Sequence, residues 1–185
     1  MSGLVVLWLP IVVSAVLVFV ASSLIHMVLP WHRNDFPRMP NEDQVMNALR
    51  PLGIPPGSYF FPRPTTRQEM RSPEFLERMK RGPVAMLTVM PGSMAMGPTM
   101  AKWFVYVLVV CALSAYVAIN ALNPGAPVKS VVRFVGLPAF LGFTLALWQM
   151  SIWYARPWSL TLKATLDGVI YAAITAGVFA WLWPS

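Results

Sequence analysis

The chain contains four long runs of apolar residues, which constrain its fold more than any other feature: 4–29, 103–122, 131–154 and 160–183. Because a helix rises about 1.5 Å per residue, twenty residues cross a hydrocarbon core of about 30 Å. Only 11% of the residues are charged, whereas soluble domains usually contain about 25%. The sequence therefore predicts an all-α integral membrane protein with four transmembrane helices.

The first run predicts a retained transmembrane helix within residues 1–30. A cleaved signal peptide needs a positively charged start, but the basic residues Arg33 and Arg38 follow this run instead of preceding it. The other three runs predict a three-helix transmembrane unit at 101–185, with Pro138 as the expected kink of the third span. Small residues four positions apart, such as Gly168 and Ala172, predict close packing between these helices.

Residues 31–100 form a basic, proline-rich segment between the first two spans. The part from 31 to 82 contains eight prolines and nine of the fourteen lysines and arginines. We expect two short helices in it. Asn41 is the predicted cap of the first, which Pro51 ends. Ser72 is the predicted cap of the second, with Pro73 at its first position and Gly82 past its end.

The second of these helices has a narrow apolar stripe of Phe75, Leu76 and Met79 beside several basic residues. This amphipathic pattern is typical of a helix on a membrane surface, and a small folded cap would also produce it. The stretch at 53–64 contains too many prolines for a helix or a central strand. The apolar stretch at 83–90 is too short to span, so it is a strand, a re-entrant piece or an interfacial segment, and 91–98 is expected to be a loop.

The distribution of basic residues predicts the orientation in the membrane. If 31–100 lies in the cytoplasm, every lysine and arginine except Lys129 and Arg133 is on the cytoplasmic side. Basic residues near span ends favour that side. We therefore expect an N-out, C-out protein whose large loop is cytoplasmic.

The hairpin between the third and fourth spans contains the most prominent polar residues of the spans, namely Gln149, Arg156, Lys163 and Asp167. Ionisable groups inside spans are candidate functional sites. Asp167 is one turn after Lys163, which favours a structural ion pair between the two, with proton or cation relay as the alternative. The four residues form either a pocket for an anionic headgroup or an interfacial anchor, and the anchor is favoured.

His26 is a weak ligand candidate, as a single axial ligand to a pigment or haem. Together with His32 and Asp35 it forms a possible metal motif, but a spacing of six residues does not place both histidines on one helix face, and Pro30 intervenes. A methionine-rich stretch could bind Cu(I) but lacks supporting cysteines or histidines. No motif for a catalytic site is present. We therefore expect no catalytic residue, no metal site and no cofactor.

The segments SSLIHMVLPWHRNDFPRMPNED, GPVAMLTVMPG, LALWQMSIWYARPWS and LDGVIYAAITAGVFAWLWP together resemble a bacterial family of small inner-membrane proteins of uncharacterised function. The resemblance extends over nearly the whole chain. It implies a bacterial inner-membrane location and a shared four-span layout, and it transfers no functional residue.

The function expected from these features is that of an accessory or scaffolding subunit of a membrane complex. The net charge of +7 lies beside apolar spans, so the expected partners are anionic headgroups and a larger complex or a second copy, and not nucleic acid. One alternative is a small transporter or proton-linked channel that uses Asp167. A second is a lipid-binding or lipid-modifying protein with a polar pocket on its cytoplasmic side.

Overall fold

The computed structural model describes residues 3–92 and 95–185, which fold into two compact units. We call the first the four-helix unit; it contains the described residues up to Pro37 and from Met96 onward. We call the second the intervening unit; it contains the described residues from Arg38 to Ala95. The intervening unit thus lies inside the segment 31–100, whose basic, proline-rich composition differs from that of the apolar runs.

Four long apolar helical stretches make up the four-helix unit. The first contains a 3-10 turn (Gly3–Leu7), α1 (Trp8–Ser23) and a π-helical turn (Leu24–Val28). The second is α4 (Met96–Ala121), the third combines α5 (Val128–Thr144) with α6 (Trp148–Tyr154), and the fourth is α7 (Trp158–Leu182). Each stretch is long and apolar enough to cross a membrane. The prediction of four helices of this kind is confirmed.

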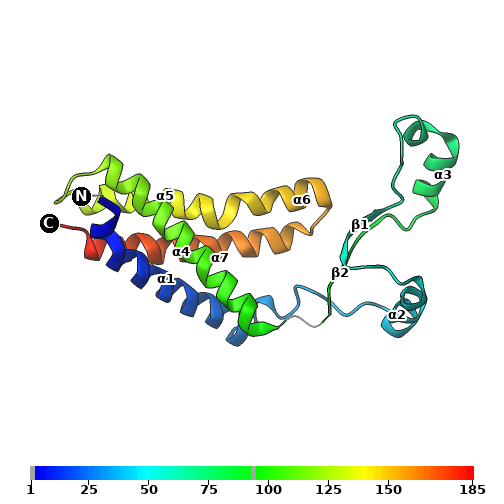
Figure 1. Ribbon diagram of the computed structural model, residues 1–185, viewed down its shortest axis with the longest axis horizontal. Coiled ribbons are helices and arrows are strands. Elements are labelled where there is room, and N and C mark those ends of the chain that lie inside the picture. Colours follow the sequence, from blue (N-terminus) through cyan, green and yellow to red (C-terminus); the bar gives the residue numbers. More distant parts are fainter. Residues whose placement is uncertain (1–2, 93–94) are drawn as a thin grey trace. The chain divides into compact units, whose positions relative to one another are not determined.

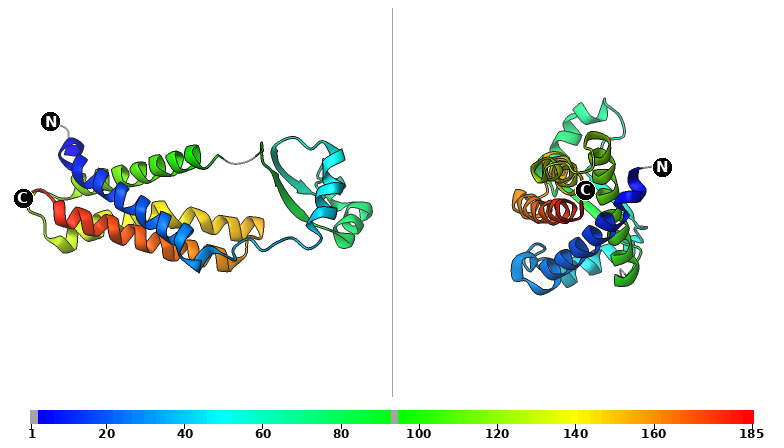
Figure 2. Two further views of the ribbon diagram at one scale, coloured as in Figure 1. Left: turned by 90° about the horizontal axis from the view of Figure 1, so that it is seen from below. Right: turned by 90° about the vertical axis from the view of Figure 1, so that its left-hand side faces the viewer.

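The four stretches pack in a ring in which each lies mainly against two neighbours (Figures 1 and 2). Helix α7 packs against α1 and α5, and α4 packs against the same two helices. Val107 and Phe143 belong to one buried cluster, and Val131 and Phe179 belong to another. Large apolar side chains also face outward, and Leu137 on α5 is 60% exposed. An apolar exterior around an apolar core is what lipid-facing helices require.

Both chain ends lie at one end of the four-helix unit (Figure 1). The backbone N–H of Gly125 donates to the carbonyl of Pro184 over 2.8 Å, and the Trp183 indole donates to the carbonyl of Asn123 over 3.2 Å. These bonds join the loop between α4 and α5 to the end of α7. The arrangement agrees with an even number of crossings.

One predicted boundary is wrong. Helix α4 begins at Met96, so the expected loop at 91–98 is shorter than predicted. Helix α5 continues through Pro138, and the third stretch changes to a 3-10 turn at Leu145–Leu147. The kink expected at Pro138 stays a prediction. The Thr144 hydroxyl donates to the carbonyl of Phe140 over 2.6 Å. Such a bond to the carbonyl four residues earlier often bends a helix.

The intervening unit contains the helices α2 (Glu42–Leu49) and α3 (Pro73–Arg81) and a two-stranded sheet. Strand β1 (Gly57–Phe61) pairs antiparallel with β2 (Ala85–Val89), so that Gly57 lies opposite Val89. The all-α prediction is therefore wrong for this unit, and a strand is the correct choice among the three alternatives for 83–90. Prolines beside β1 are tolerated because both strands of a two-stranded sheet are edge strands.

One of the two predicted helix caps is present. The Ser72 hydroxyl accepts a hydrogen bond from the backbone N–H of Phe75 over 3.1 Å, and Gly82 ends α3 with a positive φ of 63°. Asn41 precedes α2 as predicted, but its side chain makes no capping bond, because it adopts a left-handed conformation with φ of 53°.

The structure also distinguishes the two alternatives for the apolar stripe on α3. Phe75 is only 5% exposed, so its ring is not free to insert into a bilayer. A small folded cap, in which this face contributes to a core, therefore explains the stripe better than a helix that lies on the membrane.

Helices α5 and α7 approach each other closely at Gly168. A Cβ atom added there would collide with the methyl group of Thr144 and would also press on Phe143. At Gly177, on the same helix, an added Cβ would meet nothing within 4 Å. The absence of a side chain at Gly168 therefore allows the two helices to pack.

We expect Gly168→Ala to destabilise the four-helix unit by about 1–3 kcal/mol, because overpacking of a tight contact usually costs that much. The matched control Gly177→Ala should be neutral or slightly stabilising, since alanine favours helix more than glycine does. Unfolding by SDS titration in mixed micelles measures both. Equal stabilities of the two variants would contradict the close approach.

Candidate functional site

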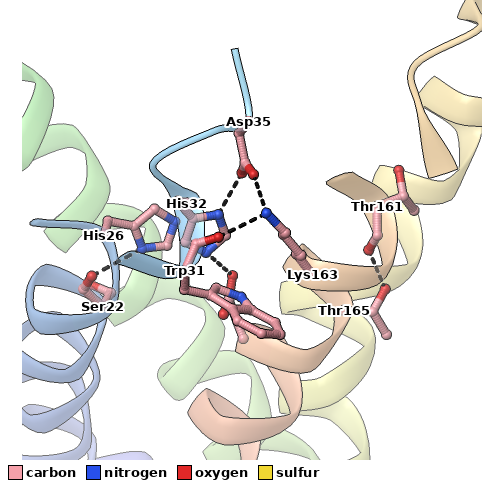
Figure 3. A network of polar contacts seen from close by, with 9 residues as sticks. Ser22, His26, Trp31, His32, Asp35, Thr161, Lys163 and Thr165 are labelled. Carbon is pink, nitrogen blue, oxygen red and sulfur yellow. Dashed lines mark hydrogen bonds and ion pairs between the residues drawn. The ribbon is translucent and has the colours of Figure 1, made fainter. Parts of the chain in front are cut away.

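The polar residues of the four-helix unit gather where the chain leaves the first span. Pro30 ends the helical path because it lacks an N–H, and Leu29 before it is extended, with ψ of 145°. The chain then forms a short 3-10 turn, Pro30–His32, and folds back toward the start of α7. Figure 3 shows His26, His32, Asp35 and Lys163 gathered there. We call these four residues, together with Asp167, the His–Asp network.

His32 lies between two carboxylates. Its Nδ1 atom is 2.6 Å from Oδ2 of Asp35, and its Nε2 atom is 2.9 Å from Oδ2 of Asp167. The Asp167 side chain is only 4% exposed. The Nε2 atom is thus at ion-pair distance from Asp167, but among the described residues it has no hydrogen-bond partner.

Lys163 pairs with Asp35 and not with Asp167, so the predicted Lys163–Asp167 pair is wrong. The Nζ atom donates to Oδ1 of Asp35 over 2.6 Å and to the backbone carbonyl of Trp31 over 2.8 Å. It also lies 5.7 Å from the centre of the Trp31 ring, within the range of a cation–π contact. The folded-back segment thus provides three favourable contacts to Lys163, which lies near the start of α7.

His26 belongs to the same network. Its ring stacks on that of His32, with centres 4.2 Å apart and planes 7° from parallel. Its Nδ1 atom is 3.0 Å from the carbonyl of Ser22. The Ser22 hydroxyl in turn accepts a hydrogen bond from the Trp103 indole over 2.8 Å, which ties this end of the first span to α4.

The expectation that the two histidines lie apart is therefore wrong. A spacing of six residues separates them only along a continuous helix, and Pro30, which was expected to keep them apart, instead ends the helix and allows His32 to turn back onto His26. The structure then brings together one ligand atom each of His26, His32 and Asp167, all within 4.8 Å of one another. These three residues could hold a metal ion.

Gln149 and Arg156 do not join Lys163 and Asp167. Gln149 is exposed on α6, and Arg156 follows the end of that helix, where Ala155 has a positive φ of 53°. Arg156 is therefore not on the same helix face as Gln149. Among the contacts of the described residues, neither one reaches the His–Asp network.

The hairpin of α6 and α7 is held by other polar groups. The hydroxyls of Ser151 and Thr161 lie 2.6 Å apart and are buried, and the Trp148 indole donates to the Thr165 hydroxyl over 3.1 Å. These bonds join α6 to α7, and the interfacial anchor predicted for the hairpin stays a prediction. Neither pair was predicted, because hydroxyl contacts between two helices leave no periodic signal in the sequence.

Asp35 remains ionised at neutral pH. Burial raises the pKa of its carboxyl, but hydrogen bonds from Lys163 and His32 outweigh that effect and hold the pKa below its ordinary value. A lowered carboxyl pKa stabilises the folded state above the ordinary pKa of about 4, and the contribution is lost as the pH falls through the lowered value. Asp35 therefore attracts Lys163 throughout the neutral range.

No protein-family model, curated protein or solved structure matches the chain. The resemblance to a bacterial family stays a prediction, and the argument for function rests on the geometry of the described residues.

A double-mutant cycle tests the pairing of Lys163. Lys163→Met and Asp35→Asn should each destabilise the protein, and their coupling energy should be about 0.5–3 kcal/mol, as found for residues in contact. The control cycle of Lys163→Met with Asp167→Asn should give a smaller coupling, because these two side chains are joined only through Asp35 and His32. Unfolding free energies in detergent micelles supply both values, and a larger coupling in the control cycle would restore the rejected pair.

Proposed function

We propose that the protein is an accessory or scaffolding subunit of a membrane complex, in which the four-helix unit is the anchor and the intervening unit binds the partner. The main support is the division of the chain into an apolar four-helix unit and a separate unit with its own sheet and helices. The His–Asp network contributes by holding Asp35 on α7, shortly before the intervening unit begins at Arg38. A scaffold is served by a chain that leaves its membrane anchor from a position that is held in place.

The intervening unit offers a basic surface for such a partner or for anionic headgroups. Lys80 and Arg81 are exposed in the last turn of α3, and neither has an ion-pair partner among the described residues. Exposed apolar side chains such as Leu76, at the other end of the same helix, add contact surface. Basic and apolar groups together suit an acidic protein surface or a headgroup layer.

The proposal places the protein in the bacterial inner membrane with both termini outside and the intervening unit in the cytoplasm. The support is the excess of basic residues on that side of the spans. Alkaline phosphatase fused at residue 60 should be inactive, and the same enzyme fused after Ser185 should be active. The opposite pattern would reverse the orientation.

Native purification in mild detergent tests the scaffolding role. We expect the full chain to co-purify in fixed stoichiometry with larger proteins, as native mass spectrometry detects. Lys80→Gln combined with Arg81→Gln should weaken this association. The matched control, Lys129→Gln combined with Arg133→Gln, removes two exposed charges near the opposite end of the spans and should leave it intact.

A lone homo-oligomer in that experiment would contradict the scaffolding role and favour a small proton-linked transporter. A buried carboxylate in an apolar helix supports this second candidate. So does Tyr171, one turn after Asp167, whose buried hydroxyl has no hydrogen-bond partner among the described residues. The hollow between α5 and α7 does not support it, because that hollow is lined mainly by apolar residues such as Leu137, Val169 and Ala176.

A further inference from the structure

The two histidines of the network each use the Nδ1 atom in a contact with the protein. Each Nδ1 atom already has a partner: the carbonyl of Ser22 for His26 and the carboxylate of Asp35 for His32. A carbonyl oxygen only accepts hydrogen bonds, so Nδ1 of His26 carries the proton. In the neutral ring, Nε2 then has a free lone pair. The same reasoning assigns a lone pair to Nε2 of His32 when Nδ1 donates to Asp35.

This proton arrangement leaves two acceptors face to face. A neutral His32 can donate to only one of the two carboxylates, and Asp35 receives that bond. The lone pair of Nε2 then meets Oδ2 of Asp167 at 2.9 Å, which is repulsive unless a proton or a metal cation lies between them. A second proton on His32, a proton on the Asp167 carboxyl or a metal cation would remove the repulsion.

The charge balance of the network also calls for a cation. Asp35 and Asp167 contribute two negative charges, and Lys163 contributes one positive charge, which it directs at Asp35. Asp167 is therefore a buried carboxylate without a full positive partner while both histidines are neutral. Buried carboxylates of this kind are paired or bind metal ions, because an unpaired buried charge is costly.

We propose that His26, His32 and Asp167 bind a divalent transition-metal ion at the end of the four-helix unit. Two imidazoles and one carboxylate are a common ligand set for Zn²⁺ with an open fourth position, and the same set binds Fe²⁺. This site revises the expectation of no metal site that the sequence alone produced. It does not depend on the proposed scaffolding role.

The surroundings of the three ligands match those of known metal sites. A histidine that binds a metal through one nitrogen usually donates the other N–H to a carboxylate or a backbone carbonyl. His32 and His26 have one partner of each kind, Asp35 and the carbonyl of Ser22. Asp35 is itself fixed by Lys163. Asp35 is thus a positioning residue that aims Nε2 of His32 at the metal.

Binding requires a small rearrangement of the site. The ligand atoms of the three residues lie within 4.8 Å of one another, and Nε2 of His32 lies 2.9 Å from Oδ2 of Asp167. Ligands about 2.0–2.2 Å from a tetrahedral metal are roughly 3.3–3.6 Å apart, so the His32–Asp167 pair must open slightly while wider separations close. The rings of His26 and His32 are also nearly parallel, so their lone pairs do not yet converge. His26 is exposed and lies in the last turn of the first span. Its ring can therefore turn toward the metal while His32 stays held between Asp35 and Asp167.

The test uses the full chain with a purification tag that contains no histidine. The protein is stripped with a chelator in detergent and titrated with Zn²⁺ against a chromophoric competitor, and bound zinc is counted by elemental mass spectrometry. We expect one zinc per chain. Replacement of zinc by Co²⁺ should give the visible absorption of a four-coordinate site with nitrogen and oxygen ligands.

Variants identify the ligands. His26→Ala, His32→Ala and Asp167→Asn should each weaken zinc binding at least 100-fold. Asp35→Asn should keep one zinc per chain with a 10–100-fold lower affinity, as expected for a partner of a ligand. Asp43→Asn, in the intervening unit, should have no effect.

Two results would overturn the metal site. The first is substoichiometric zinc in the unsubstituted protein, and the second is an affinity that the three ligand variants leave unchanged. The thermal unfolding of each metal-free variant shows whether it still folds. Because His26 is exposed and contributes little to the core, His26→Ala remains a valid test if the variants at the two buried positions do not fold.

Discussion

Asp167 is a carboxylate inside an apolar helix, and such a group needs a partner because an unpaired buried charge is costly. Nε2 of His32 approaches this carboxylate to 2.9 Å, and His32 reaches Asp167 only because Pro30 ends the first helical stretch and the chain folds back. The same fold brings Asp35 to Lys163 at 2.6 Å. The path of the chain between the first span and the intervening unit thus follows from the need to pair one buried carboxylate.

Helix α7 is where the packing and the polar network meet. It is the least apolar of the four stretches and the most buried, as expected for a helix whose polar groups are shielded from lipid by protein. Gly168 lets α5 approach on one side, and the neighbouring Asp167 binds the folded-back segment. Adjacent residues therefore attach α7 to two different parts of the chain, and a shift of α7 against α5 would also disturb the network.

The sequence predicts the local features of this protein and misses those that depend on chain reversal. The four spans follow from continuous apolar runs, and α3 follows from Ser72, Pro73 and Gly82. The contact of His26 with His32 could not be predicted from helical periodicity, because it depends on the direction the chain takes after Pro30. Lys163 was matched to Asp167 because they are one helical turn apart, whereas Asp35 is 128 residues away in sequence. The available sequence signal for the network was the pattern of His32 and Asp35, a histidine and a carboxylate three residues apart.

Zero-length cross-linking tests the fold-back most directly. A water-soluble carbodiimide joins a carboxylate to an amine only when they are in contact, and Lys163 Nζ lies 2.6 Å from Oδ1 of Asp35. Mass spectrometry of the digested protein should find an amide between Asp35 and Lys163 that disappears in Asp35→Asn. An amide between Lys163 and Asp167 in its place, or no link to Asp35, would contradict the account.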